Sequence, residues 1–441
     1  MTARPPGAAV PGARLLLLGV SVRALARSAC AGLLARRLFP GGITALDYFG
    51  DWDLLRLPVR GLSLRRDLGR PRSVTALMRA ASGLEWDAVV YAGGIENRPG
   101  LLEALERRGT ILGNGARAVR AVRDPGGFFG FLNAAGIPHA ATPAGAAGRP
   151  GSAPGADRSP GLWKPRRSGG GGRLRPAAPG EPRPRGFFFQ ERLRGIPASI
   201  AFVADGRRAV LLGASEQLAG FRPLGGSGFR YGGSIAGPAT AIIGRENLDL
   251  LATAATAITR RFGLVGLNGL DLVLSTDGVA RIIEINPRFT ASMELLEELA
   301  GRNFFDLHLR AAQGPLRRWT TSGTAAWTAS GTADRDRFLA KGILYAGRPL
   351  RGGRPGALQA LGCRDIPVPG EWIGTGAPVL TVMASGPSPE ACRRELEKRA
   401  REARRVLAGC DKIPVKRAIH RQSGRRPVNG RAGGTVRHGI L

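Results

Sequence analysis

Short apolar runs alternate with amphipathic segments over residues 13–112. The runs are too short for buried helices and predict strands, whereas apolar residues at helical spacing predict helices. The predicted strands are residues 14–19, 43–46, 87–91 and 110–112, and the predicted helices are 21–38, 73–81 and 99–108. Ser21 is expected to cap the first helix, and Pro99 suits the first turn of the third. Strands separated by helices favour a parallel sheet covered on both faces.

The rest of the chain continues the α/β pattern around segments of low complexity. Residues 141–160 form a Gly-, Ala- and Pro-rich linker, and the chain beyond about residue 413 lacks apolar periodicity and is expected to be a solvated basic tail. Strands are predicted within residues 162–203, 264–285 and 338–385, and helices at 125–135, 247–261, 294–300, 304–312 and 388–407. The fold class is therefore α/β throughout.

One predicted hairpin carries three oxygen-bearing side chains on a single face. Asp277-Gly278 lies between two apolar runs, as in a two-residue β-turn. With that turn, Asp271 stands opposite Glu284, and Asn286 projects from the same face two residues further on. Opposed carboxylates repel each other unless a cation lies between them, and an all-oxygen set suits Mg²⁺ or Mn²⁺. The alternative is a solvent-exposed hairpin with a wet polar face, which the apolar flanks disfavour.

A lysine followed by four glycines forms a second candidate site. Lys164 is the only lysine in the first 340 residues of a chain whose other basic residues are almost all arginine. A compact ammonium binds phosphate as a point charge, and the glycines at 169–172 leave backbone N–H groups free to contact phosphate oxygens. The segment does not match a Walker loop. A flexible Gly/Arg linker is the alternative interpretation.

The composition of the chain disfavours several classes of protein. The formal net charge is +32 and the pI about 11.6, yet no zinc-finger spacing or RNA-binding aromatic signature accompanies this charge, so nucleic-acid binding is the least favoured function. The four cysteines are too scattered for a disulfide framework or a zinc site. No apolar run is long enough to span a bilayer, and we expect a soluble cytoplasmic protein without a membrane partner. The turn after the first strand lacks the GxGxxG fingerprint of a dinucleotide site.

The order of three segments resembles the ATP-grasp superfamily. After the lysine and glycine loop comes Phe189-Gln190-Glu191-Arg192-Leu193-Arg194-Gly195, and then the hairpin with its Asp and Glu-Ile-Asn motif. A closer resemblance is to the predicted ATP-dependent carboligases related to biotin carboxylase. It rests on the segments 19–29, 49–53 (Phe-Gly-Asp-Trp-Asp), 284–294 (Glu-Ile-Asn-Pro-Arg-Phe-Thr-Ala-Ser-Met-Glu), 365–367 and 376–382.

The resemblance implies a layout and a set of site residues. A Rossmann-like domain (1–113) would precede a two-lobed ATP-grasp domain (114–315, with a flexible insert at 141–160), a small β-rich module (316–390), and a charged helix with a basic disordered tail (391–441). The implied contacts are Lys164, Gly169, Gly170, Gly171 and Gly172 with phosphates, Gln190, Glu191 and Leu193 with adenine, and Asp271, Glu284 and Asn286 with one or two Mg²⁺ (or Mn²⁺). Arg288 would face the transferred phosphoryl group and, with Lys164, act in catalysis. Where the family usually places a further phosphate-binding lysine, this chain offers Arg120 and Arg123.

The activity implied is ligation that depends on Mg-ATP. A small carboxylate would be activated as an acyl-phosphate for attack by an amine or a carbon nucleophile, and residues 216–233, including Arg222, Arg230 and Tyr231, are the expected acceptor contacts. His308 is expected to be structural. A nucleotide-binding module without turnover is the main alternative, a basic nucleic-acid-binding protein is the lesser one, and a homodimer is compatible with the sequence.

Overall fold

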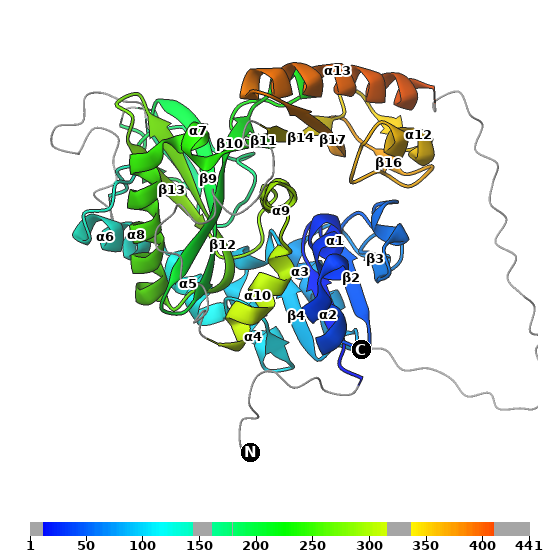
Figure 1. Ribbon diagram of the computed structural model, residues 1–441, viewed down its shortest axis with the longest axis horizontal. Helices are drawn as coiled ribbons and strands as arrows, with labels where there is room; N and C mark the ends of the chain where they lie inside the picture. The colour runs from blue at the N-terminus through cyan, green and yellow to red at the C-terminus, as the bar shows by residue number, and fades with distance from the viewer. Residues whose placement is uncertain (1–11, 144–160, 179, 315–336, 410–441) are drawn as a thin grey trace, which may run out of the picture.

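The computed structural model describes residues 12–143, 161–178, 180–314 and 337–409, and the following account concerns these residues. The first sheet is parallel, with the strand order β3-β2-β1-β4-β5. It lies in the lower half of Figure 1, among the blue and cyan elements. Its strands are β1 (Leu15–Leu18), β2 (Ile43–Asp47), β3 (Arg60–Ser63), β4 (Ala88–Tyr91) and β5 (Thr110–Ile111). All four leucines of β1 are buried, as expected for the central strand of a sheet covered on both faces.

Helices on both sides bury the first sheet. They are α1 (Arg23–Ala31), α2 (Leu33–Leu38), α3 (Val74–Ser82), α4 (Pro99–Glu106) and α5 (Ala116–Val122), with the short turns η1 (Leu54–Arg56) and η2 (Ile95–Asn97). Leu16 and Leu18 pack with α3 and α4, whereas Leu15 and Leu17 pack with α1. This alternation is the period-two pattern of a buried strand. The predicted parallel α/β sheet is confirmed.

The second sheet has seven strands in the order β13-β12-β9-β10-β11-β14-β17, and neighbouring strands are antiparallel. The strands are β9 (Gly195–Asp205), β10 (Ala209–Ala219), β11 (Tyr231–Ala236), β12 (Val265–Ser275), β13 (Ala280–Asn286), β14 (Phe338–Tyr345) and β17 (Pro378–Gly386). Strands β14 and β17 belong to the segment predicted as a β-rich module, and they extend this sheet directly.

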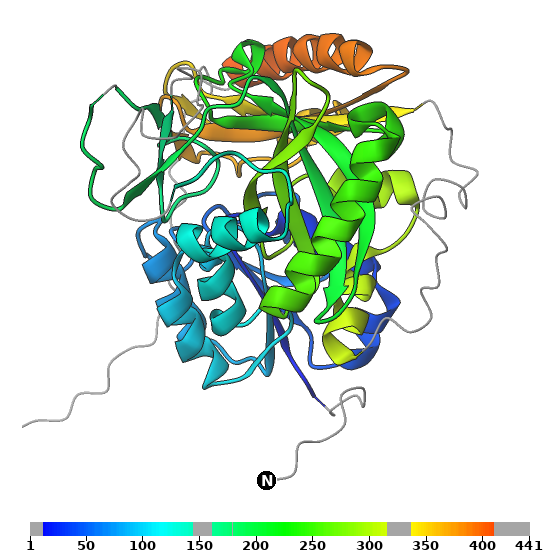
Figure 2. The same ribbon diagram turned by 90° about the vertical axis from the view of Figure 1, so that its left-hand side faces the viewer.

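Different helices cover the two faces of the large sheet. The long green helix α8 (Arg245–Phe262) lies across one face with α7 (Ala239–Ile243), and α13 (Pro389–Ala408) covers the β14–β17 end (Figure 2). The other face packs through α9 (Met293–Ala300) and α10 (Phe304–Gln313) onto α1 and α2 of the first domain. That second face is therefore enclosed between the two sheets.

Smaller elements complete the described structure. They are α6 (Pro125–Ala134), η4 (Arg222–Leu224), α12 (Pro355–Ala360), the three-stranded sheet of β6 (Leu162–Pro165), β7 (Arg175–Pro176) and β8 (Phe187–Gln190), and the pair β15 (Leu350–Arg351) and β16 (Trp372–Ile373). Most of the predicted linker at 141–160 and the tail beyond residue 409 lie outside the described residues. The domain boundaries remain a prediction.

The prediction of one helix over residues 21–38 is wrong. Two helices form instead, because Asp306 on α10 accepts hydrogen bonds from the backbone N–H groups of Leu33 and Leu34 and so caps a new helix start. A side chain on Gly32 would clash with Asp306. Ser21 is exposed and caps nothing, since Asp47 accepts the N–H of Val22 at 3.0 Å and satisfies the start of α1.

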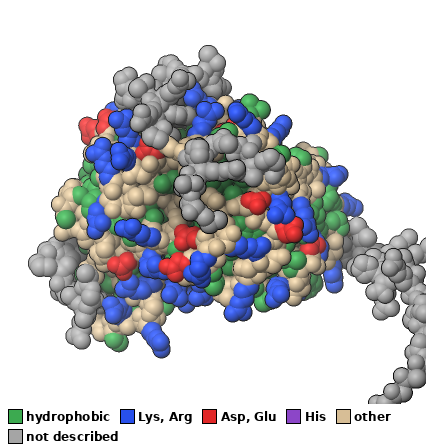
Figure 3. Space-filling model, turned by 90° about the horizontal axis from the view of Figure 1, so that it is seen from below, with side chains coloured by type: hydrophobic (Ala, Val, Ile, Leu, Met, Phe, Trp, Pro, Cys, Tyr) green, Lys and Arg blue, Asp and Glu red, His purple; other side chains and the backbone are tan. Residues whose placement is uncertain are grey.

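Charged side chains of both signs are interspersed on one face of the molecule (Figure 3). On the face shown in Figure 3, basic side chains are spread widely and acidic ones lie among them. Within the described part of the chain, no helix has the length and apolarity needed to cross a bilayer.

Candidate active site

The hairpin of β12 and β13 brings Asp271 opposite Glu284, as the sequence predicts. The predicted two-residue turn is wrong, however. Ser275 donates its N–H to Val279, and the loop is the three residues 276–278, with Gly278 at φ 81°. This arrangement is a turn closed by a glycine in the left-handed region. A β-bulge between Asp271 and Leu272 shifts the register by one residue and restores the predicted pairing at Asp271.

Asp271 lies in a polar but enclosed position. Its Oδ1 accepts a hydrogen bond from Gln217 Nε2 at 2.8 Å, and its Oδ2 accepts one from Asn286 Nδ2 at 2.9 Å. Burial, reinforced by the charge of Glu284, raises the pKa of Asp271 to about 6. Loss of hydration disfavours its negative charge, and the two neutral amides compensate only in part.

Glu284, in contrast to Asp271, lies between two cations. Its Oε1 accepts from Arg123 Nη1 at 2.5 Å, and its Oε2 lies 3.5 Å from Lys164 Nζ. Although burial opposes ionisation, Lys164 and Arg123 together lower the pKa of Glu284 to about 2. The pKa values of the two facing carboxyl groups therefore differ, about 6 against about 2, because cations contact Glu284 directly whereas neutral amides contact Asp271.

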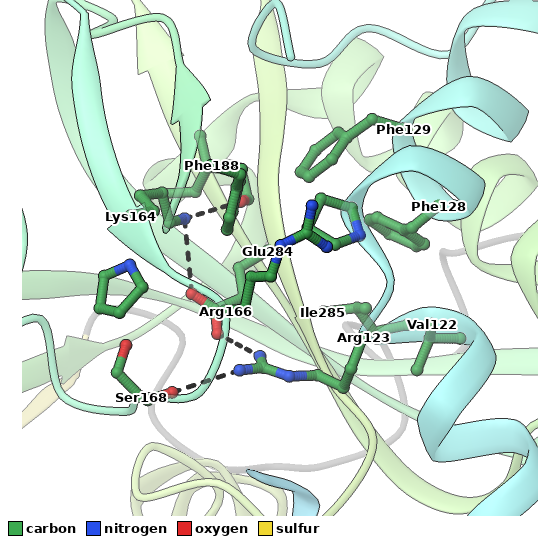
Figure 4. A pocket seen from close by; sticks show the side chains of 13 residues that line it. Val122, Arg123, Phe128, Phe129, Lys164, Arg166, Ser168, Phe188, Glu284 and Ile285 are labelled. Atoms are coloured by element: carbon green, nitrogen blue, oxygen red, sulfur yellow. Dashed lines mark hydrogen bonds and ion pairs between the residues drawn. The ribbon is translucent and has the colours of Figure 1, made fainter. Parts of the chain in front are cut away.

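Lys164 forms part of a pocket beside the hairpin (Figure 4). The pocket is partly open and holds about 410 Å³ when the space open to solvent is included. Its walls are largely apolar and come from α5, α6, β6, β8 and β13, and its charged groups are Arg123, Lys164, Arg166 and Glu284. In Figure 4, Phe128 and Phe129 approach from one side and Phe188 from the other. An apolar cavity edged by cations suits a flat ring that carries an anionic group.

The glycine loop lies next to this pocket without lining it. Ser168 lines the pocket and its carbonyl accepts from Arg123 Nη2 at 3.2 Å, but residues 169–172 are absent from the described walls. The loop docks on β11 instead, since the carbonyl of Gly170 accepts from Tyr231 N at 2.9 Å. At Gly171 (φ 70°), an added Cβ would lie 1.9 Å from the Phe229 carbonyl, which explains glycine there. The phosphate contacts of the four glycines at 169–172 remain a prediction.

The predicted adenine-binding segment follows β8. Gln190 is buried, and its Nε2 donates to the carbonyl of Ile283 at 3.3 Å, the same oxygen that accepts from Lys164 Nζ at 3.0 Å. Glu191 accepts the N–H of Ala141, while Leu193 is partly exposed. Gln190 is thus adjacent to Lys164, and none of Gln190, Glu191 and Leu193 lines the described pocket.

Arg288 joins the hairpin to the first domain. Its Nε donates to Glu96 Oε1 at 2.8 Å, its Nη2 to Asn286 Oδ1 at 3.1 Å, and its Nη1 to the carbonyl of Phe289 at 3.1 Å. Asn286 therefore contacts both Asp271 and Arg288. Two of the predicted metal ligands, Asp271 and Asn286, therefore lie in one hydrogen-bonded group with the predicted catalytic arginine, and Glu284 stands opposite Asp271 on the neighbouring strand.

A row of polar side chains continues from Asp271 across the enclosed face of the large sheet. Paired residues of antiparallel strands share a face, and so do residues two apart along one strand. The pairings link Asp271, Ser199, Ser215, Gln217, Ser234 and Lys341 in that order. Of the residues predicted to contact an acceptor, Tyr231 adjoins this row through Ser234 (2.8 Å), whereas Arg230 donates to the Gly376 carbonyl and Arg222 is exposed.

The part of the chain that carries this candidate site matches a known protein family. A sequence profile of the ATP-grasp domain family matches residues 150–292, which include Lys164, the glycine loop and the whole hairpin. This segment of the chain therefore matches the ATP-grasp domain family. This confirms the family to which the three motifs are similar.

Solved structures agree with this ATP-grasp fold at low sequence identity. Biotin carboxylase from Campylobacter jejuni matches with a TM-score of 0.59 and 12% identity, covering 85% of this chain and 87% of that chain. The biotin carboxylase domain of Hydrogenobacter thermophilus 2-oxoglutarate carboxylase gives 0.59 and 13%, covering 85% and 86%. L-amino acid ligase from Bacillus licheniformis gives 0.57 and 17%, covering 88% and 97%. No curated protein sequence matches the chain. The predicted biotin carboxylase-like architecture is thus confirmed.

Some residues of this candidate site have no clear signal in the sequence. Glu96 and Asn97 come from η2, far from every motif, yet they contact Arg288 and Arg123. In the sequence, Phe128 and Phe129 resemble the buried apolar residues of any helix, although they also form a wall of the pocket. The nearest sequence signal for Glu96 is its place two residues after the Gly93-Gly94 pair that follows β4.

Proposed function

We propose that the protein is an ATP-dependent ligase that activates a small carboxylate as an acyl-phosphate for attack by an amine or a carbon nucleophile. The observation that carries this proposal is that Lys164 and Glu284 line one pocket, with Asp271 paired to Glu284 across the hairpin, in an ATP-grasp fold. Structural relatives include an L-amino acid ligase and biotin carboxylases, one of them described as a complex with MgADP and bicarbonate.

The donor set fits a magnesium ion carried by the nucleotide. Among the described residues, no three His, Cys, Asp or Glu side chains converge, so the protein would supply two carboxylates and the amide oxygen of Asn286. Mg²⁺ commonly takes one or two carboxylates and completes its shell with water and phosphate oxygens. When bound, it would neutralise charge on the phosphates. Mn²⁺ suits the same ligands.

The cations of the chain would position and neutralise the phosphates. Lys164 is a buried point charge next to Glu284, and Arg123 lies on the other side of that carboxylate. Arg288 would face the γ-phosphoryl group as it passes to the substrate carboxylate and ADP leaves. The nucleophile would then attack the acyl carbon, and phosphate would depart. Phosphoryl transfer of this kind depends on positioning and charge neutralisation, so no nucleophilic side chain is required.

The polar row on the enclosed face of the sheet favours an acceptor site beyond the hairpin. Gln217 contacts Asp271, and Ser234 and Lys341 continue the row toward Glu294. A polar substrate bound there would lie next to the metal ligands and between the two sheets. Tyr231 would border the same site.

A screen for ADP release tests the proposal. The full-length protein is incubated with Mg-ATP and panels of small carboxylates, including bicarbonate and amino acids, with and without amines. The proposal predicts ADP and phosphate only when a particular carboxylate is present. Stabilisation by Mg-ATP without turnover on any carboxylate would instead identify a nucleotide-binding module and contradict the ligase assignment.

A further inference from the structure

The turn η2 of the first domain reaches into the candidate site. It follows β4 after Gly93 and Gly94, and Gly94 has φ 104°, a conformation that side chains disfavour. At Gly93, the Cζ, Nη1 and Nη2 atoms of Arg288 lie 3.5–3.7 Å from the position of an added Cβ. The guanidinium of Arg288 therefore rests against the backbone at the start of this turn.

Glu96 is the most deeply buried acidic group at the site. Only 1% of its surface is exposed; Oε1 accepts from Arg288 Nε, and Oε2 has no partner among the described residues. Burying a carboxylate costs several kcal/mol unless it is well paired. A fully hydrogen-bonded structural ion pair would not leave one oxygen unpaired. The side chain is better explained by its effect on Arg288.

The neighbouring residue acts on the second arginine of the site. Asn97 Oδ1 accepts from Arg123 Nη2 at 3.1 Å, while Nη1 of the same guanidinium donates to Glu284. Two consecutive residues of one short turn thus contact the two arginines that flank the metal-binding hairpin. Both arginines are mostly buried, with 12% of the Arg123 side chain and 14% of the Arg288 side chain exposed.

These contacts leave a defined set of donors for a ligand. An arginine carries five N–H groups, and the described contacts of each guanidinium use three of them. Fixing Nε and one edge of the Arg288 guanidinium orients the remaining donors. A planar guanidinium held in this way can bind oxyanions without first losing its own conformational freedom.

We propose that Glu96 and Asn97 are positioning residues that hold Arg288 and Arg123 in the orientation in which they contact the phosphates. This inference rests on the proposed function. It gives the first domain a role in phosphate chemistry, although the nucleotide pocket itself is built from later parts of the chain. Glu96 acts on the phosphoryl group through Arg288, and Asn97 acts on the metal-bound phosphates through Arg123 and Glu284.

A purely structural role would be to join the two domains, and other residues already do this. Tyr91 Oη, in the first domain, donates to the carbonyls of Asn114 and Pro287 in the next domain. Tyr91 lies on β4, a few residues before Glu96, and its hydroxyl contacts neither arginine. Tyr91→Phe is therefore a matched control that weakens the same domain contact.

The test compares two nucleotide probes in the full-length protein by calorimetry. One probe is Mg-ATP, and the other is Mg-ADP with aluminium fluoride, which mimics a phosphoryl group during transfer. Glu96→Leu is expected to weaken binding of the fluoride complex by about tenfold or more and to change Mg-ATP binding little. Glu96→Gln, which keeps an acceptor for Arg288 Nε, should recover part of this loss. Asn97→Ala should weaken both probes to a similar degree.

The results separate failure of this inference from failure of the proposed function. If the unaltered protein binds neither probe, the proposed function itself is wrong. If the unaltered protein binds both probes and the Glu96 and Asn97 variants lose only thermal stability, as Tyr91→Phe would, the two residues merely join the domains and the inference is wrong. Should Glu96→Leu fail to fold, Glu96→Gln and Asn97→Ala still decide the question.

Discussion

At the scale of single residues, the hairpin shows how environment divides two similar acids. Asp271 and Glu284 pair across one ladder, yet burial raises the pKa of the first, and Lys164 and Arg123 lower the pKa of the second. In the metal-free protein, Asp271 is therefore held at a cost that a divalent cation would remove. Binding of a cation would therefore account for an acid at this enclosed position.

Asp271→Asn is expected to stabilise the metal-free protein and to impair nucleotide binding. The pKa of Asp271 is about 6 in the folded protein and about 4 in the unfolded chain. The folded protein therefore loses stability as pH rises from about 4 to about 6, and above pH 6 the charged aspartate is destabilising. Removing its charge should raise the free energy of unfolding near pH 7 by roughly 1–3 kcal/mol. Urea unfolding in EDTA measures this gain.

The matched control for that variant lies on the same hairpin. Asp277 is half-exposed and hydrogen-bonded to Arg281, which lowers the pKa of Asp277 to about 2. Asp277→Asn should therefore give no stabilisation and should bind Mg-ATP normally. Equal responses of the two variants would contradict the asymmetry described for the hairpin.

At the scale of elements, long-range contacts decide where local patterns fail. The pairing of Asp271 with Glu284 is predictable because the apolar alternation fixes which residues share a face. The loop is one residue longer than its Asp-Gly motif suggests, and only the bulge restores the register. The break between α1 and α2 depends on Asp306, and the position of Arg288 depends on Glu96; both partners are distant in the sequence. Local patterns therefore predict the strands and the pairing of Asp271 with Glu284, but not these distant contacts.

The contact of α10 with β12 depends on a neutral histidine. His308 is buried, its Nδ1 accepts from Leu267 N at 2.9 Å, and its Nε2 lies 2.9 Å from the carbonyl of Leu112. An added Cβ on Gly266 would lie 2.4 Å from Nδ1, so the ring fills the space beside that glycine. These contacts support the structural role predicted for His308.

Stability should fall in mild acid because of His308. Burial lowers the pKa of His308 to about 4, so between about pH 6.5 and pH 4 only the unfolded chain binds the proton. The stabilising contribution of neutral His308 is complete above the pKa of the unfolded chain, and it is lost as pH falls from about 6.5 to about 4. Comparing urea unfolding at about pH 7 and pH 5, His308→Gln should show a smaller loss than the unaltered protein, by roughly 1–2 kcal/mol. An identical pH dependence would show that His308 does not titrate in this way.

At the scale of the whole molecule, a buried charge network joins the first domain, the sheet and the C-terminal segment. Glu294 on α9 pairs with Arg23 of α1, with Lys341 of β14 at 2.6 Å and with Arg364 at 2.9 Å. Asp365 also pairs with Arg23, and Asp53 accepts the backbone N–H groups of Asp365 and Ile366. The segments similar to the carboligases, around residues 23, 53, 294 and 365, thus meet in space.

Removing the central anion of this network should destabilise the molecule strongly. Glu294→Gln removes the shared counter-charge of Arg23, Lys341 and Arg364 in a buried site, and losses of this kind are roughly 3–5 kcal/mol. Glu298→Gln is the control, since Glu298 is partly exposed and pairs with Arg27 and Arg364; it should cost less than about 1 kcal/mol. Chemical denaturation measures both. Similar losses in the two variants would contradict a central role for Glu294.

Calorimetric titration of Mg-ATP into the unaltered protein and into Glu284→Gln tests the central claim most directly. The account predicts binding that requires Mg²⁺ and that weakens at least about tenfold in Glu284→Gln, while Asp277→Asn binds normally. Circular dichroism checks that both variants are folded. Equal Mg-ATP affinity in folded Glu284→Gln and in the unaltered protein would contradict the account.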